Sequence, residues 1–114
     1  MHEYSLVEAL MRRVEDEAKR RNALAIHGLK VSLGELAGVD PELFHTAYDT
    51  FREGTMCAKA PLELVRHPAR WSCPRCARDF ARGELLRCEA CGVPARLDPN
   101  SDALILESVD MEVP

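Results

Sequence analysis

The chain has 114 residues, of which 46% are hydrophobic and 30% are charged, and it carries a formal net charge of −4. This length fits one domain, or one domain with a small attached module, and the composition excludes a disordered chain. Nucleic-acid-binding proteins of this size usually carry a basic surface, so we expect no nucleic-acid partner for this acidic chain.

The sequence gives no sign of a membrane protein. No segment approaches the roughly 18 consecutive apolar residues of a membrane span. Residues 1–5 show neither the basic region nor the apolar run of a secretory signal peptide. We therefore expect a soluble cytoplasmic protein with no membrane partner. The cytosol keeps thiols reduced, so its five cysteines favour metal binding over disulfides.

The first predicted element is an amphipathic helix over residues 4–21. Its apolar residues recur at helical spacing and form one stripe: Val7, Leu10, Met11, Val14 and Ala18. Ser5 and Glu8 fit a capping box, although the helix could equally begin two or three residues earlier. The basic run at residues 19–21 suits the negative end of the helix dipole, which explains it better than nucleic-acid binding does.

A strand and a second helix follow. Residues 25–33 alternate apolar and polar side chains, which predicts a strand with one buried face. Asp40 is then a strong helix N-cap, because Pro41 and Glu42 suit the first turn. The predicted apolar stripe of this second helix consists of Phe44, Ala47, Tyr48 and Phe51. Gly54 is interpreted as its C-terminal stop.

Two further strands are predicted at residues 61–67 and 103–113, the second returning to the sheet of the first two. Between them lies a segment of different composition that is rich in cysteine, proline and arginine. The fold class is therefore α+β, with two helices packed on a small three-stranded sheet and an inserted zinc ribbon that uses four cysteines. We expect a discontinuous α/β domain over residues 1–68 and 102–114, and a zinc-binding ribbon domain over residues 69–101.

The inserted segment contains two CxxC pairs separated by eleven residues: Cys73, Cys76, Cys88 and Cys91. Two tight turns that face each other supply the tetrahedral sulfur shell that zinc prefers. Gly92 suits the positive φ of such a turn, and Trp71 and Phe80 can pack beside the site. A thioredoxin-like redox role is disfavoured because the pairs lie outside a βαβ context. Iron uses the same ligands, so the metal remains open, with zinc as the default.

A closed four-cysteine shell leaves no open position for water, so we expect a structural site. No phosphate loop, dinucleotide fingerprint, nucleophile elbow or HExxH motif is present. Cys57 is interpreted as a partly buried apolar residue, and His27, His45 and His67 as surface or core histidines. The sequence therefore predicts that the protein is not an enzyme.

The N-terminus offers a second set of metal ligands. The Met1 amine and the His2 amide nitrogen can form one chelate ring, and the His2 imidazole can close another. The Glu3 amide or carboxylate can complete the set. Amine, deprotonated amide and imidazole nitrogens are ligands of square-planar Ni(II) or Cu(II).

Several motifs together resemble the HypA/HybF nickel metallochaperones of NiFe-hydrogenase maturation. They are Met1-His2-Glu3, Gly34-Glu35-Leu36-Ala37-Gly38-Val39-Asp40-Pro41-Glu42, Gly54-Thr55 and the paired CxxC units. The resemblance implies a nickel-binding α/β domain with an inserted zinc domain, and Ni²⁺ held by the Met1 amine, backbone amides and the His2 imidazole, with Glu3 contributing. It also implies two partners, the nickel-handling GTPase HypB and the hydrogenase large-subunit precursor. In some organisms the family also serves urease maturation.

Two features depart from the family or leave alternatives. Residues 45–48 are less aromatic and apolar than the family tends to be, so the packing of the second helix can differ. No histidine flanks a CxxC pair within the ribbon, which argues against an exchange of cysteine for histidine ligands. A zinc-ribbon nucleic-acid or transcription accessory protein and a dithiol redox enzyme are the alternative functions.

Overall fold

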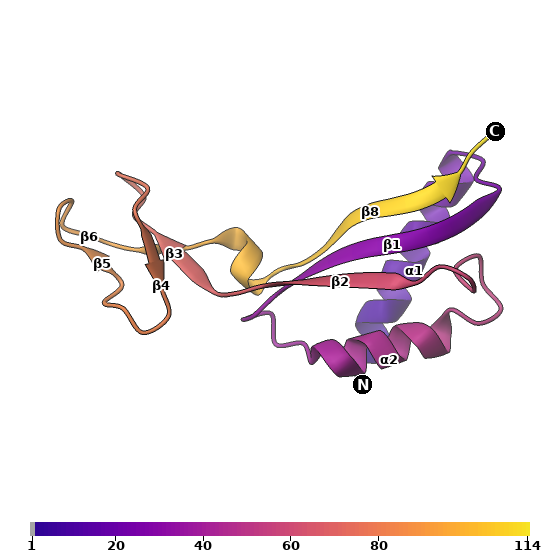
Figure 1. Cartoon of the computed structure of the whole chain (residues 1–114), viewed down its shortest axis with the longest axis horizontal. Helices are drawn as coiled ribbons and strands as arrows, with labels where there is room; N and C mark the ends of the chain where they lie inside the picture. The colour runs from indigo at the N-terminus through magenta and orange to yellow at the C-terminus, as the bar shows by residue number, and fades with distance from the viewer. Residues whose placement is uncertain (1) are drawn as a thin grey trace.

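A computed structural model describes residues 2–114, and Met1 lies outside the described residues. The molecule is elongated, with principal extents of 54 × 31 × 17 Å, and its two ends hold two different sets of elements (Figure 1). One end is built from α1 (His2–Arg20), β1 (Ala25–Gly34), α2 (Pro41–Phe51), β2 (Leu62–His67) and β8 (Leu104–Glu112). None of the helices within residues 2–114 is long and apolar enough to cross a membrane.

The larger sheet has the strand order β2-β1-β8. β1 runs parallel to β2 and antiparallel to β8, so α2 is the crossover helix of a β1-α2-β2 unit. The return of β8 to this sheet confirms the predicted layout of two helices on a three-stranded sheet. The register of β8 on β1 shifts twice, and the second shift leaves Glu107 without a partner residue on β1.

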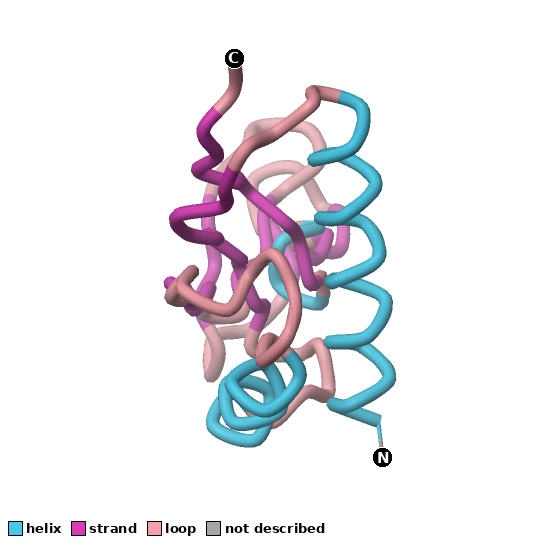
Figure 2. The backbone as a smooth tube through the Cα atoms, turned by 90° about the vertical axis from the view of Figure 1, so that its right-hand side faces the viewer, coloured by secondary structure: helices cyan, strands magenta, loops and turns pink. Residues whose placement is uncertain are grey.

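Both helices contribute to one core against the sheet: α1 runs across the strands, and α2 lies beside β2 near the start of α1 (Figure 1 and Figure 2). The five apolar residues predicted for the stripe of α1 are all buried. On α2, Phe44, Ala47 and Tyr48 are buried, whereas Phe51 is half-buried and packs its ring 5.5 Å from that of Tyr4. The hydrophobic core therefore lies between the two helices and the inner face of β1.

The helix starts differ in how well the sequence predicted them. The Asp40 side chain accepts hydrogen bonds from the backbone N–H groups of Glu42 and Leu43, as an N-cap does, and α2 begins at Pro41. α1 begins at His2, so the earlier of the two predicted starts is correct and a capping box at Ser5 is wrong. α2 ends at Phe51, before Gly54, whose φ of 74° lies in the following loop.

The other end of the molecule consists of short strands with only a small core. β3 (Arg70–Ser72), β4 (Asp79–Ala81) and β7 (Arg96–Leu97) form one sheet, and β5 (Arg87–Cys88) and β6 (Val93–Pro94) form a hairpin. The 3-10 helix η1 (Pro99–Asp102) leads back to β8. Phe80 is buried beside Cys73 and Cys88, with Trp71 packed against them, as the sequence predicted.

Candidate metal sites

The four cysteines of the two CxxC pairs come together at one point. Their Sγ atoms all lie within 4.8 Å of one another. The Sγ atoms of Cys76 and Cys88 are 3.8 Å apart. Zn–S bonds of about 2.3 Å in a tetrahedron put neighbouring sulfurs roughly 3.8 Å apart. The Cys76–Cys88 spacing therefore matches a tetrahedral metal site, and the four sulfurs together are close enough to share one ion.

The two CxxC turns have the same backbone geometry. The N–H of Ala77 donates to the carbonyl of Cys73 at 2.9 Å, and the N–H of Gly92 donates to the carbonyl of Cys88 at 2.8 Å. Gly92 has the predicted positive φ, 68°, and Ala77 adopts the equivalent conformation at 63°. The sequence does not predict this conformation at Ala77, because an alanine gives no sign of a left-handed backbone.

Backbone N–H groups stabilise the thiolate form of Cys73. Cys73 Sγ accepts hydrogen bonds from the N–H groups of Cys76 and Arg75, which lower the pKa of Cys73 to about 6. The neighbouring sulfurs, that of Cys73 foremost, raise the pKa of Cys91 to about 12. Four thiols this close therefore resist full deprotonation by themselves, and a divalent cation among them would remove that resistance.

The cluster is buried on one side only. Cys73 and Cys88 are buried, Cys91 is half-buried and Cys76 is exposed. Cys57 is fully buried in the larger core, away from the cluster, where burial raises the pKa of its thiol. Cys57 therefore lies outside the cluster among apolar residues, as interpreted, although it is fully and not partly buried.

At the other end of the molecule, the N-terminal candidate ligands lie at the start of α1. The nickel prediction includes Met1, which lies outside the described residues. The His2 side chain is 59% exposed, and its Nδ1 lies 3.7 Å from a Glu3 carboxylate oxygen. Glu3 is buried, and its Oε2 accepts a hydrogen bond of 3.2 Å from the backbone N–H of Asp40. That bond is the largest of the influences that lower the pKa of Glu3.

Because α1 begins at His2, its first backbone N–H groups are not used within the helix and are available as metal ligands. The first N–H groups of a helix have no acceptor within the helix, so the amides of His2 and Glu3 are not used in the hydrogen bonds of α1. At a helical ψ of about −42° successive backbone nitrogens lie on the same side of the chain, and a chelate needs that arrangement. His2 lies in α1, so the backbone nitrogens of His2 and Glu3 lie on the same side of the chain.

Asp40 has a second role in this region beyond the helix capping that the sequence predicts. Its side chain caps α2, and its backbone N–H holds the Glu3 carboxylate. The only signal in the sequence was that the Asp40 motif and Met1-His2-Glu3 occur together in the family that the chain resembles.

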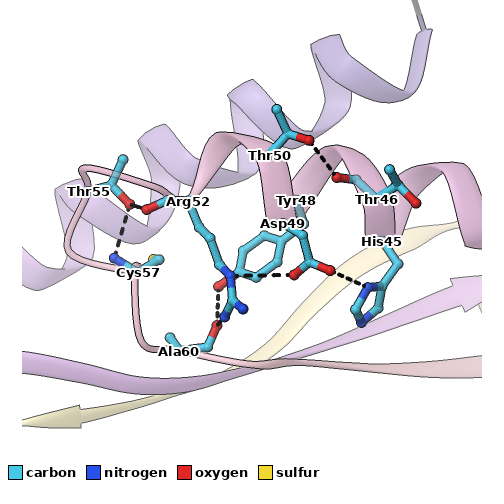
Figure 3. Close-up of polar contacts among 9 residues, drawn as sticks. All are labelled: His45, Thr46, Tyr48, Asp49, Thr50, Arg52, Thr55, Cys57 and Ala60. Atoms are coloured by element: carbon cyan, nitrogen blue, oxygen red, sulfur yellow. Dashed lines mark hydrogen bonds and ion pairs between the residues drawn. The ribbon is translucent and has the colours of Figure 1, made fainter.

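The remaining histidines do not join either cluster. His45 Nδ1 lies 3.2 Å from Asp49, and His27 Nε2 lies 3.3 Å from Glu112. Figure 3 shows His45 and Asp49 on α2, next to the side chain of Arg52. Arg52 and Tyr48 both donate to the carbonyl of Ala60, so this network ties α2 to the loop before β2 (Figure 3).

One side chain connects the two ends of the molecule. Glu35, in the loop after β1, accepts a hydrogen bond of 2.7 Å from the N–H of Ala69, and its other oxygen lies 2.9 Å from the Arg82 guanidinium. Ser101 Oγ accepts from the N–H of Arg70 at 3.0 Å. The two Glu35 contacts attach the cysteine-containing segment to the loop after β1, whereas the Ser101 bond joins η1 to β3 within that segment.

The fold and the cysteine cluster define a small α+β protein with an inserted four-cysteine metal-binding segment. A family model described as "Hydrogenase/urease nickel incorporation, metallochaperone, hypA" matches residues 1–111. The chain therefore belongs to the HypA family, which confirms the resemblance seen in the sequence. The protein called hydrogenase maturation factor HypA in Aquifex aeolicus (strain VF5) is 34% identical over 114 residues, covering 99% of both chains.

Further relatives agree over the full length. HypA of Wolinella succinogenes is 33% identical over 98% of this chain and 96% of its own. The solution structure of the Ni metallochaperone HypA from Helicobacter pylori has a TM-score of 0.71 at 30% identity and covers 98% of each chain. A second solution structure of a HypA protein has a TM-score of 0.74 at 32% identity, over 97% of this chain and 96% of its own.

Proposed function

We propose that this protein carries Ni²⁺ as cargo at its N-terminus and delivers it to the NiFe-hydrogenase large-subunit precursor during maturation. The ligands are the Met1 amine, the His2 imidazole and the backbone amides of His2 and Glu3. The observation that carries the proposal is the start of α1, where the His2 side chain is exposed, these amides are not used by the helix and the Glu3 carboxylate is bonded to Asp40.

In this proposal Glu3 acts through its backbone and by position. Its carboxylate is occupied by the Asp40 N–H and lies beside the His2 ring, where it can orient the imidazole. Binding releases the protons of amides and imidazole, so nickel affinity should rise with pH. Copper(II) exceeds nickel in intrinsic affinity, so selectivity comes from metal availability and from contacts with the partner.

We propose that Cys73, Cys76, Cys88 and Cys91 hold a structural Zn²⁺. Tetrahedral spacing and the N–H donors to Cys73 support this. The ion would fix the shape of residues 69–101, which we propose form a zinc-ribbon domain distinct from the nickel-binding domain of residues 1–68 and 102–114. The four cysteines would fill every coordination position of the zinc ion, so the zinc could not bind a water or a substrate. We therefore propose that the protein is a nickel carrier and not an enzyme.

The proposed partners are the nickel-handling GTPase HypB and the hydrogenase large-subunit precursor, and urease maturation proteins where these occur. The proposed location is the cytoplasm, which suits five free cysteines in a chain that uses four of them as ligands. Membership of the HypA family favours this function over the nucleic-acid and redox alternatives.

Nickel titration of purified protein tests the N-terminal chelate. His2→Ala, and a chain with one extra residue before Met1, should each bind Ni²⁺ at least about tenfold more weakly than the native chain. His27→Ala is the matched control, because His27 is 53% exposed and also lies beside a carboxylate. If both N-terminal variants bind nickel as tightly as the native chain and the control do, the proposal of a nickel site at the N-terminus is wrong.

A further inference from the structure

The sheet β2-β1-β8 has a second face, turned away from both helices, that the proposed nickel function does not use. Along β1, positions that face the outer side alternate with positions that face the helices. The outer positions are Gly28, Lys30 and Ser32. Two adjoining hollows lie on this face, of about 330 Å³ and about 400 Å³, and Lys30 and Ser108 line both of them. The outer face is therefore one continuous trough.

Ser32 lies in the floor of this trough and is unusual. It is 1% exposed, and its hydroxyl is the one buried side-chain polar atom without a hydrogen-bond partner among residues 2–114. Burying a hydroxyl without a partner costs stability. Ser32 is one of the residues that line the larger hollow, so its side chain lies on the trough side of β1.

Gly28 is the second unusual residue of the floor. A Cβ atom at this position would meet only the Pro61 carbonyl oxygen, at an ordinary 3.8 Å, and no positive φ requires glycine here. Glycine within a strand weakens it and often marks a bulge or the close approach of another backbone or ligand, and the register of β8 on β1 does shift between Ile26 and Gly28. The register shift accounts for Gly28, so only Ser32 is left unexplained by packing within the chain.

The charges of the trough indicate what kind of molecule would occupy it. Lys30 lies 3.7 Å from Glu63 and is balanced by it. The carboxylates of Glu107 and Asp110 have no hydrogen-bond or ion-pair partner within residues 2–114, and each lines one of the hollows. The surplus is acidic, so a basic occupant complements it.

The dimensions favour a helix. Strands lie about 4.8 Å apart, so the face of three strands is roughly 10 Å wide, which matches the diameter of one helix. We propose that the outer face of the sheet is a docking surface for a basic helix of a partner protein. The helix lies over Gly28, places a polar group against the Ser32 hydroxyl and meets Glu107 and Asp110 with its cationic side chains.

Amide chemical shifts of the labelled full chain, titrated with two synthetic helical peptides, test this proposal. Each peptide has about 14 residues, roughly 21 Å of helix, with leucine on one side and either lysine or glutamate on the other. The lysine peptide should shift the outer-face amides of β1, β2 and β8, and the glutamate peptide should not. Equal binding of both peptides, shifts over the helices, or no binding would overturn the proposal.

Three variants sharpen the test. Gly28→Ala raises the floor and Asp110→Lys reverses its charge, so each should weaken binding of the lysine peptide about tenfold. Glu53→Lys is the control, since it makes the same charge change at an exposed loop residue away from the sheet. Equal affinity of Asp110→Lys and Glu53→Lys would contradict the proposal. So would outer-face shifts that appear on raising protein concentration without peptide, because the occupant would then be a second copy of the chain.

Discussion

The Glu3 carboxylate accepts a hydrogen bond from the backbone N–H of Asp40, 3.2 Å away, and so joins the first turn of α1 to the N-cap of α2. The exposed His2 side chain lies directly beside this bond. The N-terminal end of α1 is thereby attached to the rest of the fold immediately next to the proposed nickel ligands.

This relationship predicts different effects for two substitutions of Glu3. Glu3→Gln keeps an acceptor for the Asp40 N–H and should bind nickel much like the native chain. Glu3→Ala removes the acceptor and should weaken binding by about tenfold, as loss of a supporting hydrogen bond does at metal sites. Nickel titration gives the affinities, and the chemical shift of the Asp40 amide reports the bond. If Gln behaves like Ala, the negative charge matters and the hydrogen bond does not.

Removing the metal should separate the two ends of the molecule. The cysteine-containing segment has a core of only a few side chains, so it depends on the ion, whereas the larger end has its own core. On chelation, amide hydrogen exchange should accelerate first across β3 to β7, while the amides of β1 keep most of their protection. Equal loss of protection at both ends would contradict this prediction.

Ser32 and Ser101 form a matched pair for a stability measurement. Both are 1% exposed, but Ser101 Oγ bonds to the backbone of Arg70 whereas Ser32 Oγ has no partner within residues 2–114. Ser101→Ala should lower the free energy of unfolding by about 1 kcal/mol, and Ser32→Ala should leave it unchanged or raise it. Urea denaturation measures both values. A comparable loss in the two variants would show that Ser32 is satisfied in the folded chain.

Gly34 and Gly28 lie on the same strand, but substitution by alanine should change the stability of the protein at Gly34 and not at Gly28. A Cβ at Gly34 would lie 2.3 Å from the carbonyl oxygens of Asn100 and Ser101, so the end of β1 and η1 must move apart. We expect Gly34→Ala to cost at least about 2 kcal/mol of stability, whereas Gly28→Ala should cost nothing. Thermal unfolding distinguishes the two, and a harmless Gly34→Ala would mean that η1 is not held against β1.

A pH dependence of stability is expected from Glu17 on α1. Hydrogen bonds from Arg21 and then Arg20 lower the pKa of Glu17 in the folded chain. A lowered folded pKa contributes stability above the unfolded pKa, and the contribution is lost as pH falls through the folded pKa. Glu17→Gln should therefore be less stable than the native chain at neutral pH, and the difference should vanish in acid. A difference that persists below the folded pKa would exclude the ionised form as its source.

The sequence by itself determined the elements and the cysteine cluster. Helical and alternating periodicity located α1, β1 and the core residues, and Asp40-Pro41 fixed the start of α2, because these signals are local to the chain. The CxxC spacing was sufficient for the four sulfurs to be expected together, since each turn holds its two cysteines over a few residues.

Only the tertiary structure decided how distant residues meet. The Glu3–Asp40 bond, the attachment of Ala69 and Arg82 by Glu35, and the contact of Gly34 with η1 join residues far apart in the sequence. No local pattern encodes such pairs. The positive φ of Ala77 and the unpartnered hydroxyl of Ser32 likewise follow from surroundings that the residue type does not reveal. The physical reason is that periodicity predicts which side of an element is buried, whereas the partner of each polar group depends on how the elements pack.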